Sequence, residues 1–355
     1  MANNVSRIVF VQISDLHFGD AINRHSAEWI PGCQSHHVDL AIALKTTLRR
    51  MKSIFGLEAT EKLHLLVSGD LTSRGQGDEF HVAHTYLLSE FVLDRNAMGS
   101  LGSETVALPP DVTLTPGLRW PPSQLLTIPG NHDHWNGNPG VFPPAFNPDV
   151  SPQHVPTSPW RKRLVSRDEN LSLDLYGIDS NRGWVNEMFD SNQFAGGQIH
   201  PDDLDWIERE HEKHSDADLR CLLSHHGVSD RAVRSRFRLL PEAKTLLGPS
   251  KVAVASLCRN CKVHVILTGH LHQHLVEPIS PGHNCYEVRC FSTLQGEPDQ
   301  NSPQGFLVHV VTKDRFDEIT WEVHPFVVVQ KTHRAGFEIS NPPEFMTTLK
   351  FPSNQ

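Results

Sequence analysis

Five short apolar segments, each followed at once by polar residues, constrain the fold of this chain more than any other feature. Residues 8–13, 63–67, 125–128, 219–223 and 263–267 are rich in Val, Ile and Leu and are too short to be helices. Nearly continuous apolar strands indicate a sheet that is covered on both faces, as in α/β proteins. Ligands bind in the loops at the carboxyl ends of such strands. We therefore expect the residues that follow these strands to converge at one edge.

The residues after the five segments share one pattern, a small residue followed by Asp, Asn or His. The motifs read Ser14-Asp15-Leu16-His17, Ser68-Gly69-Asp70, Pro129-Gly130-Asn131-His132-Asp133, Ser224-His225-His226-Gly227 and Thr268-Gly269-His270-Leu271-His272. One such motif alone is compatible with an ordinary turn, because Gly, Pro, Asn and Asp favour turns for backbone reasons. Five of them in one chain predict a site assembled from distant parts of the sequence.

The segments between these strands complete an α/β pattern. Apolar residues recur at helical spacing over 36–55, 78–93 and 201–214, and 240–260 contains a helical pattern interrupted by Gly248-Pro249. A sixth strand is predicted at 171–178, with a loop after it that supplies substrate contacts at most. Runs at 285–291, 306–311, 319–323 and 326–329 have no helices between them and fit an antiparallel continuation of the sheets. Residues 97–122 and 135–160 are rich in Gly or Pro and read as insertions over the site edge.

Composition excludes several classes of function. The formal net charge of −9 argues against a chain-wide affinity for nucleic acid or anionic lipid, which needs basic surface. We find neither a secretory signal nor an apolar stretch near the roughly 20 residues of a membrane span, so a cytoplasmic location without membrane partners is expected. The six cysteines are then expected to be reduced thiols. Cys258 and Cys261 have zinc-like spacing, and a zinc knuckle with Cys285 and Cys290 is the alternative to buried or surface thiols.

The side chains in the five motifs suit metal chemistry. Asp, Asn and His without thiolate are ligands for Mn, Fe or Zn rather than for a structural zinc site. The set is large enough for two ions with one carboxylate between them, which is the arrangement of a two-metal hydrolase. Such ions activate a water near neutral pH and clamp the oxygens of a phosphoryl group, so no Ser or Cys nucleophile is required.

Taken in order, the five motifs resemble those of the calcineurin-like metallophosphoesterases. The resemblance implies an α/β fold, a four-layer α-β-β-α sandwich of two mixed β-sheets flanked by helices, with loop or cap insertions over the metal site. It also implies one metallophosphoesterase domain over residues 1–355, with insertions at about 97–122 and 135–160 and a β-rich part from about 285.

The resemblance assigns roles position by position. One metal is expected to be held by Asp15, His17, Asp70 and His272, and the other by Asp70, Asn131, His225 and His270, with Asp70 bridging. The choice of His225 over His226 follows the family pattern. His132 is expected to face the phosphate as a catalytic residue, and Asp133 is expected to orient His132. The cofactors are two divalent or mixed-valence ions of Mn, Fe or Zn.

Substrate contacts are predicted at three further residues, His25, Arg182 and Arg234. His25 lies in the loop after His17, and Arg182 follows the sixth strand. Arg234 belongs to the run Arg231 to Arg238, for which a solvated basic loop is the alternative interpretation.

Departures from other branches of the family favour a phosphodiesterase. Protein phosphatases and many monoesterases read GDxxDRG and GNHE, whereas this chain has Gly69-Asp70-Leu71-Thr72-Ser73-Arg74-Gly75 and ends its third motif in Asp133. The motifs are most similar to those of the cyclic-nucleotide and glycerophosphodiester phosphodiesterases. We expect a hydrolase that breaks a P–O bond with a metal-bridging hydroxide as nucleophile. The alternatives are a phosphomonoesterase, a nuclease for which nucleic acid is only a substrate, and a metal-free protein-binding scaffold. The physiological substrate and the oligomeric state are not specified by the sequence.

Overall fold

A computed structural model describes residues 5–18, 38–73, 75, 77–89, 117–134, 156–182, 196–230, 245–279, 284–294, 303–330 and 337–352. Two of the predicted substrate contacts, His25 and Arg234, lie outside these residues, as does most of each predicted insertion.

The described chain forms two mixed β-sheets. The first has seven strands in the order β12-β11-β10-β1-β2-β3, with β13 also paired to β11. Its strands are β1 (Ser6–Ile13), β2 (His64–Ser68), β3 (Leu125–Ile128), β10 (Gly305–Lys313), β11 (Ile319–Gln330), β12 (Phe337–Ser340) and β13 (Thr347–Phe351). The second has six strands in the order β4-β5-β6-β7-β9-β8. These are β4 (Trp160–Val165), β5 (Ser172–Gly177), β6 (Leu219–Leu223), β7 (Val265–Thr268), β8 (Leu275–Pro278) and β9 (Tyr286–Arg289).

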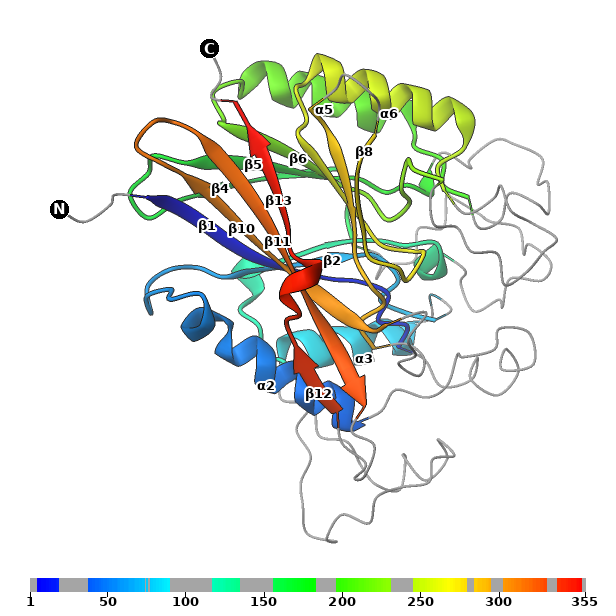
Figure 1. The fold of residues 1–355 in the computed structure, drawn as a ribbon. Coiled ribbons are helices and arrows are strands. Elements are labelled where there is room, and N and C mark those ends of the chain that lie inside the picture. The colour runs from blue at the N-terminus through cyan, green and yellow to red at the C-terminus, as the bar shows by residue number, and fades with distance from the viewer. Residues whose placement is uncertain are drawn as a thin grey trace, which may run out of the picture.

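Helices cover the outer faces of both sheets. Helices α2 (Val38–Ile54) and α3 (Gly77–Leu88) lie on the first sheet, and α5 (Pro201–Lys213) and α6 (Gly248–Asn260) lie on the second (Figure 1). Three apolar clusters fill the layers, one between the first sheet and its helices, one between the sheets, and one between the second sheet and its helices. Alternate residues of β1 serve different clusters, since Val9 and Val11 face the helices while Ile8 and Phe10 face the other sheet. The expected α-β-β-α sandwich is confirmed.

The five motif-bearing strands divide between the two sheets. Strands β1, β2 and β3 run parallel in that order in the first sheet, and β5, β6 and β7 run parallel in that order in the second. The loops after β1 and β2 stay paired beyond the strand ends, because the amide of Asp15 donates to the carbonyl of Gly69 and that of His17 donates to the carbonyl of Asp70. The motifs therefore converge from two stacked sheets rather than from the edge of one.

A buried polar network joins the two sheets beneath these loops. The side-chain amide of Gln12 on β1 donates to the hydroxyl of Ser68 on β2 and to the carbonyl of Thr268 on β7. Its Oε1 accepts from Nε2 of His309 on β10, at 3.1 Å, and Nδ1 of His309 accepts from the indole of Trp321 on β11. Ser68 and Thr268 are the first residues of two of the motifs. The network therefore fixes where these two loops begin relative to each other.

Three strands differ from the sequence-based expectation. The runs 319–323 and 326–329 form one strand, β11, which continues through Pro325. Proline is tolerated there because β13 pairs with Ile319 to Val323 and β12 with Val327 to Gln330, so no strand lies beside Pro325 on that edge. The run at 285–291 gives β9, which is antiparallel to β8 but parallel to β7. Strand β4 begins at Trp160 and was not predicted, because its Arg-Lys-Arg centre gives no apolar run.

The cysteines do not assemble the alternative zinc knuckle. Cys258, Cys261 and Cys285 lie in the cluster beneath α6, whereas Cys290 lies between the two sheets. The five described cysteines are free and buried. None of them belongs to a group with metal-ligand spacing in the described part of the chain. In the same part, no helix is both long and apolar enough to span a membrane.

Candidate metal centre

Tight turns at the strand ends carry the predicted ligands. Nine non-glycine residues of the described chain have a positive φ, and five of these are predicted ligands: Asp15, His17, Asp70, His270 and His272. The left-handed region costs an L residue about 1–2 kcal/mol, and it persists where the surrounding structure imposes it. Backbone strain is therefore concentrated in the loops that were predicted to bind metal.

Four of the predicted ligands lie together around His17. The ligand atoms of Asp15, His17 and His272 are all within 4.8 Å of one another. Oδ1 of Asp15 is 3.3 Å from Nε2 of His272 and 3.8 Å from Nε2 of His17. Nε2 of His17 is also 3.6 Å from Oδ2 of Asp70. The structure thus brings together the four side chains that were predicted to hold one ion.

A second group forms on the other side of Asp70. Ligand atoms of Asp70, His225 and His270 lie within 4.8 Å of one another. Nε2 of His225 is 3.3 Å from Oδ2 of Asp70 and 3.1 Å from Oδ1 of Asn131. Nδ1 of His225 donates to the carbonyl of Ser68 at 2.7 Å, which orients the ring with Nε2 toward the cluster. All seven predicted ligands are therefore assembled, and Asp70 lies between the two groups.

His225, rather than its neighbour His226, is the member of the cluster with Asp70. Nδ1 of His226 is 2.8 Å from the hydroxyl of Ser180, and the His226 ring packs on that of His270 with centroids 4.3 Å apart. His226 thus packs against the predicted ligand His270 and helps to fix the position of its ring.

The geometry of the donor set fits cations. Oδ1 of Asp15 and Nε2 of His270 are buried without a hydrogen-bond partner. Leaving such atoms unpaired costs about 1–3 kcal/mol each. Two ligand atoms that are each about 2.1 Å from one ion lie about 3.0–3.4 Å apart in octahedral or tetrahedral coordination. The closest separations in the cluster fall in this range.

Electrostatics in the cluster centre on Asp70. Burial opposes ionisation of this carboxyl, but the imidazoles of His225, His132 and His17 hold its pKa well below the usual range. Burial would lower the pKa of His225, yet the charge of Asp70 raises it to about 9. Burial and the neighbouring imidazoles lower the pKa of His270 well below its usual value. Asp70 is thus the anionic group toward which the surrounding nitrogens turn.

His132 presents one ring nitrogen to this cluster. Its Nδ1 donates to the carbonyl of Ser73 at 2.9 Å, and its Nε2 lies 3.8 Å from Oδ2 of Asp70. The backbone N–H of His132 donates to Oδ1 of Asp70. Burial lowers the pKa of His132 more than the charge of Asp70 raises it. Because Nδ1 carries the proton donated to Ser73, Nε2 at the edge of the cluster is the acceptor nitrogen of the neutral ring and takes up a proton only in the imidazolium form.

Asp133 does not contact the His132 ring, contrary to the sequence-based expectation. Its buried carboxylate accepts hydrogen bonds from the backbone N–H groups of Gly130, Leu71 and Thr72 and from the Thr72 hydroxyl. The ring of His132 is oriented by Ser73 instead. Burial and the charge of Asp70 raise the pKa of Asp133 to about 6. Asp133 is therefore a positioning residue that ties the third motif to the loop after Asp70.

The loop after β5 contributes more than was expected of it. Oδ2 of Asp179 lies 2.8 Å from Nε2 of His134, the residue that follows Asp133. Burial opposes ionisation of Asp179, but the His134 imidazole lowers the pKa of this carboxyl. Burial also opposes protonation of His134, but the charge of Asp179 raises the pKa of this imidazole. The signal was present in the sequence, because Asp179 follows a strand as the five motifs do. It was missed because Asp179-Ser180-Asn181 matches none of the five motifs.

Arg182 lies in the same loop and forms an ion pair with the buried carboxylate of Asp203 in α5. Its side chain remains 42% exposed. A substrate contact through Arg182 stays a prediction, as do those through His25 and Arg234.

Comparison with known proteins agrees with this geometry. The family model described as calcineurin-like phosphoesterase matches residues 8–274. The chain belongs to the calcineurin-like phosphoesterase family. These phosphoesterases are dinuclear metal enzymes, and in this chain Asp70 is the carboxylate that lies between the two groups of predicted ligands. No curated protein sequence matches the chain significantly.

The solved structures to which this chain is similar are distant from it in sequence. GAP50, the anchor in the inner membrane complex of Plasmodium, is 11% identical with a TM-score of 0.48, and the match covers 95% of this chain and 89% of that one. A dimetal phosphatase from Danio rerio is 12% identical with a TM-score of 0.48, covering 97% and 99%. A putative 5′-nucleotidase from Staphylococcus aureus is 12% identical with a TM-score of 0.42, covering 99% of this chain and 55% of that one.

Proposed function

We propose that this phosphoesterase is a metal-dependent phosphodiesterase. The observation that carries the proposal is the convergence of seven Asp, Asn and His side chains into two groups around Asp70, with Nε2 of His132 at their edge. Asp15, His17, Asp70 and His272 would hold one ion, and Asp70, Asn131, His225 and His270 the other. Such ions, of Mn, Fe or Zn, supply charge stabilisation for the phosphoryl oxygens and activation of a water.

The chain's own residues have separate tasks in this proposal. Asp70 and Asn131 would hold the ions in place, and this would fix the position at which the phosphoryl group binds. His132 in its imidazolium form would then donate the Nε2 proton to the leaving oxygen, while the Ser73 carbonyl orients the ring by accepting from Nδ1–H. Asp133 and Thr72 hold the two loops together without contacting substrate.

The preference for a diester rests on the loop after Asp70. Two residues depart from the monoesterase patterns: Ser73 stands where GDxxDRG has its second Asp, and Asp133 stands where GNHE has Glu. Both lie beside His132, because the Ser73 carbonyl accepts from the His132 ring, and Asp133 accepts from Thr72, the neighbour of Ser73, at 2.8 Å. These two departures support a site of the phosphodiesterase type.

Activity on matched substrates tests the proposal. The protein is loaded separately with Mn, Fe and Zn and assayed on bis-p-nitrophenyl phosphate, p-nitrophenyl phosphate, a p-nitrophenyl carboxylic ester and single-stranded DNA. We expect the phosphodiester to be hydrolysed fastest. Asp70→Asn is expected to abolish metal binding and activity, whereas His214→Ala, at the exposed end of α5, serves as the matched control. Faster turnover of the monoester, or of DNA alone, would contradict the proposal.

A metal-free scaffold is the remaining alternative class. Elemental analysis of the purified protein separates the two, because a scaffold would hold no transition metal and would lose no function in the Asp70→Asn variant. A cytoplasmic location belongs to the same proposal and is supported by the free thiols of the five described cysteines.

A further inference from the structure

A hollow lined by cationic side chains lies at the opposite ends of the strands from the metal centre. It has a volume of about 440 Å³. His64, which lines it, is the first residue of β2, whereas Asp70 follows the last residue of the same strand. Six residues of extended chain span about 20 Å. The hollow is therefore separate from the site that holds the proposed phosphodiesterase activity.

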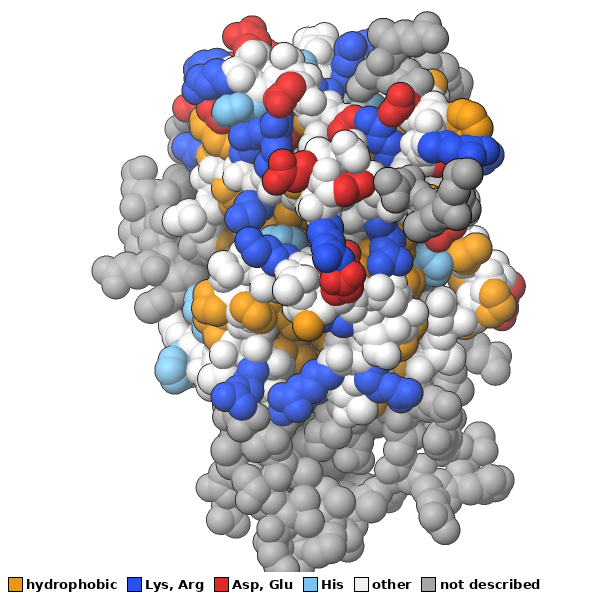
Figure 2. Space-filling view, turned by 90° about the vertical axis from the view of Figure 1, so that its left-hand side faces the viewer, with side chains coloured by type: hydrophobic (Ala, Val, Ile, Leu, Met, Phe, Trp, Pro, Cys, Tyr) orange, Lys and Arg blue, Asp and Glu red, His pale blue; other side chains and the backbone are white. Residues whose placement is uncertain are grey.

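Both sheets contribute to the walls of this hollow. Arg7 and His64 come from the first sheet, and Lys162 and Arg163 from β4 of the second. Of the charged side chains in the lining, five are cationic and one, Glu61, is acidic. The carboxylate of Glu61 accepts from the backbone N–H of Glu58. In Figure 2, which views the side of the molecule where β1 begins, Lys and Arg side chains form a band across the middle of the face.

Two lysines in this hollow carry charge that nothing in the described chain neutralises. Lys62 is exposed and Lys162 is half-buried, and the ammonium group of neither forms an ion pair or hydrogen bond with another described residue. Arg7 donates to the backbone carbonyl of Gly56 rather than to a carboxylate. By contrast, Arg163 is paired with Asp174 and Asp216, and Arg167 with Glu58. Three cations are thus available to a ligand.

The buried His64 lies between these lysines. Burial, together with the positive charges of Lys162 and Lys62, lowers the pKa of His64 to about 4. The Nδ1 atom of this neutral imidazole is buried without a hydrogen-bond partner. An anion in the hollow would relieve the repulsion among these groups.

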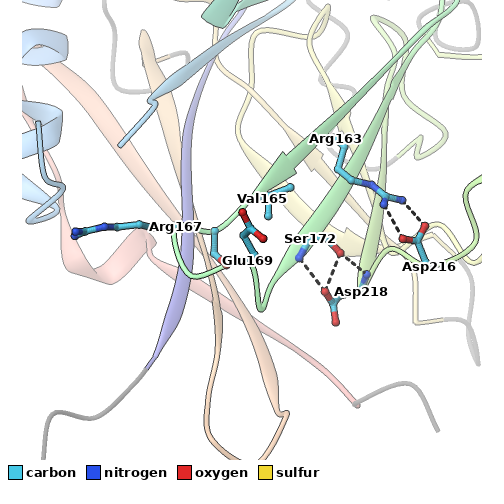
Figure 3. A pocket seen from close by; sticks show the side chains of 8 residues that line it. Arg163, Val165, Arg167, Glu169, Ser172, Asp216 and Asp218 are labelled. Carbon is cyan, nitrogen blue, oxygen red and sulfur yellow. Dashed lines mark hydrogen bonds and ion pairs between the residues drawn. The ribbon is translucent and has the colours of Figure 1, made fainter. Parts of the chain in front are cut away.

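The neighbouring hollow on β4 shows the contrast. It measures about 530 Å³ and shares Arg163 and Arg167 with the first, but Asp216, Asp218 and Glu169 also line it. Figure 3 shows Arg163 turned toward Asp216, while Arg167 extends in the opposite direction. Acidic side chains therefore balance the charge there, and only the hollow beside Lys62 and Lys162 has a surplus.

We infer that the hollow formed by Arg7, Lys62, His64 and Lys162 is a binding site for a small phosphorylated molecule, distinct from the metal centre. Its volume is within the range of small-molecule sites. Phosphate oxygens accept charge-assisted hydrogen bonds from lysine and arginine. A ligand held by both sheets would also stabilise their packing.

Calorimetric titration with inorganic pyrophosphate tests this inference. Metal-depleted protein in EDTA is used, so that the metal centre binds no phosphate and failure of the phosphodiesterase proposal leaves the result unaffected. We expect one pyrophosphate per chain and a rise in the unfolding temperature. The double variant Lys62→Ala/Lys162→Ala should bind about tenfold or more weakly, because each lysine supplies a charge-assisted hydrogen bond.

Two controls decide between the outcomes. The variant Lys213→Ala/Lys350→Ala removes the same number of charges at exposed positions on α5 and β13 and should bind pyrophosphate like the parent protein. The circular dichroism spectrum and the unfolding temperature of the ligand-free Lys62→Ala/Lys162→Ala variant show whether it folds like the parent protein. The inference is overturned if the parent protein binds no pyrophosphate, or if the cavity variant binds it equally well. Lysine-dependent binding of single-stranded DNA or anionic vesicles without binding of pyrophosphate would overturn it too.

Discussion

At the scale of single residues, His132 combines a fixed ring orientation with a ring nitrogen that faces the cluster. The Ser73 carbonyl accepts from Nδ1, so Nε2 is the nitrogen that faces the cluster, and it carries a proton when the ring is an imidazolium. We predict that His132→Ala lowers kcat by about 10²- to 10⁴-fold with unchanged metal content, as expected for loss of a general acid. The loss should be larger for a cyclic nucleotide, which has an alkoxide leaving group, than for bis-p-nitrophenyl phosphate. Steady-state kinetics and elemental analysis measure both. An equal loss for the two substrates would exclude proton donation.

Asp133 makes a different residue-scale prediction, which concerns stability. Its carboxylate accepts from three backbone N–H groups and one hydroxyl in a buried setting. Each donor left unpaired costs about 1–3 kcal/mol, so Asp133→Ala should lower the free energy of unfolding by more than 3 kcal/mol. Asp133→Asn retains one acceptor oxygen and should lose less. Urea unfolding of the metal-depleted proteins measures this order, and equal stability of the two variants would contradict it.

At the scale of elements, the glycines that begin the motifs permit the loops to touch. A Cβ at Gly130 would overlap Oδ1 and the backbone nitrogen of Asp70, whereas a Cβ at Gly248 in α6 would meet nothing within 4 Å. We predict that Gly130→Ala displaces Asp70 and lowers both metal content and activity by at least about tenfold. The matched Gly248→Ala should retain both and leave stability unchanged or slightly higher. Wild-type metal content in the Gly130→Ala variant would refute the prediction.

The positions of the strands along the chain were predicted from the sequence better than the pairing of the strands within the sheets. The segment 125–128 was located exactly as β3, because a short apolar run bounded by turn residues has few other conformations. Pairing depends on distant residues, so the parallel position of β9 beside β7 was not visible in its own sequence. The continuity of β11 through Pro325 likewise depends on where β12 and β13 end. Edge strand β4 was hidden by its charged side chains.

The same distinction holds for the candidate site. Ligand types and their order along the chain follow from five local motifs, and the structure brings the seven predicted side chains together. Contacts within the site were less predictable, because they depend on how the loops approach one another. Asp133 turned to Thr72 instead of His132, and Asp179 reached His134 from another strand. Local sequence thus indicates the chemistry, and packing determines which side chain supports it.

At the scale of the whole molecule, a histidine buried between the two sheets makes the stability of the fold depend on pH. His309 is fully buried there between Gln12 and Trp321, with Phe10 stacked on its ring at 4.7 Å. Burial, with smaller contributions from His274 and His324, lowers the pKa of His309 to about 3. The imidazole is therefore neutral in the folded protein at pH values where the unfolded chain protonates it.

The sign of the resulting pH dependence is fixed by this shift. Between an unfolded pKa near 6.5 and the folded pKa of about 3, the unfolded chain binds one more proton at this residue. Stability is therefore complete above pH 6.5 and falls by about 1.4 kcal/mol per pH unit below it for this one group. We predict that His309→Phe lowers stability at pH 7, since the Trp321 indole loses its acceptor. The free energy of unfolding of this variant should also decrease less steeply below pH 6.5. Urea unfolding at pH 7, 6, 5 and 4 measures both effects, with His214→Phe on the exposed end of α5 as control. An unchanged acid slope in His309→Phe would show that protonation elsewhere separates the two sheets in acid.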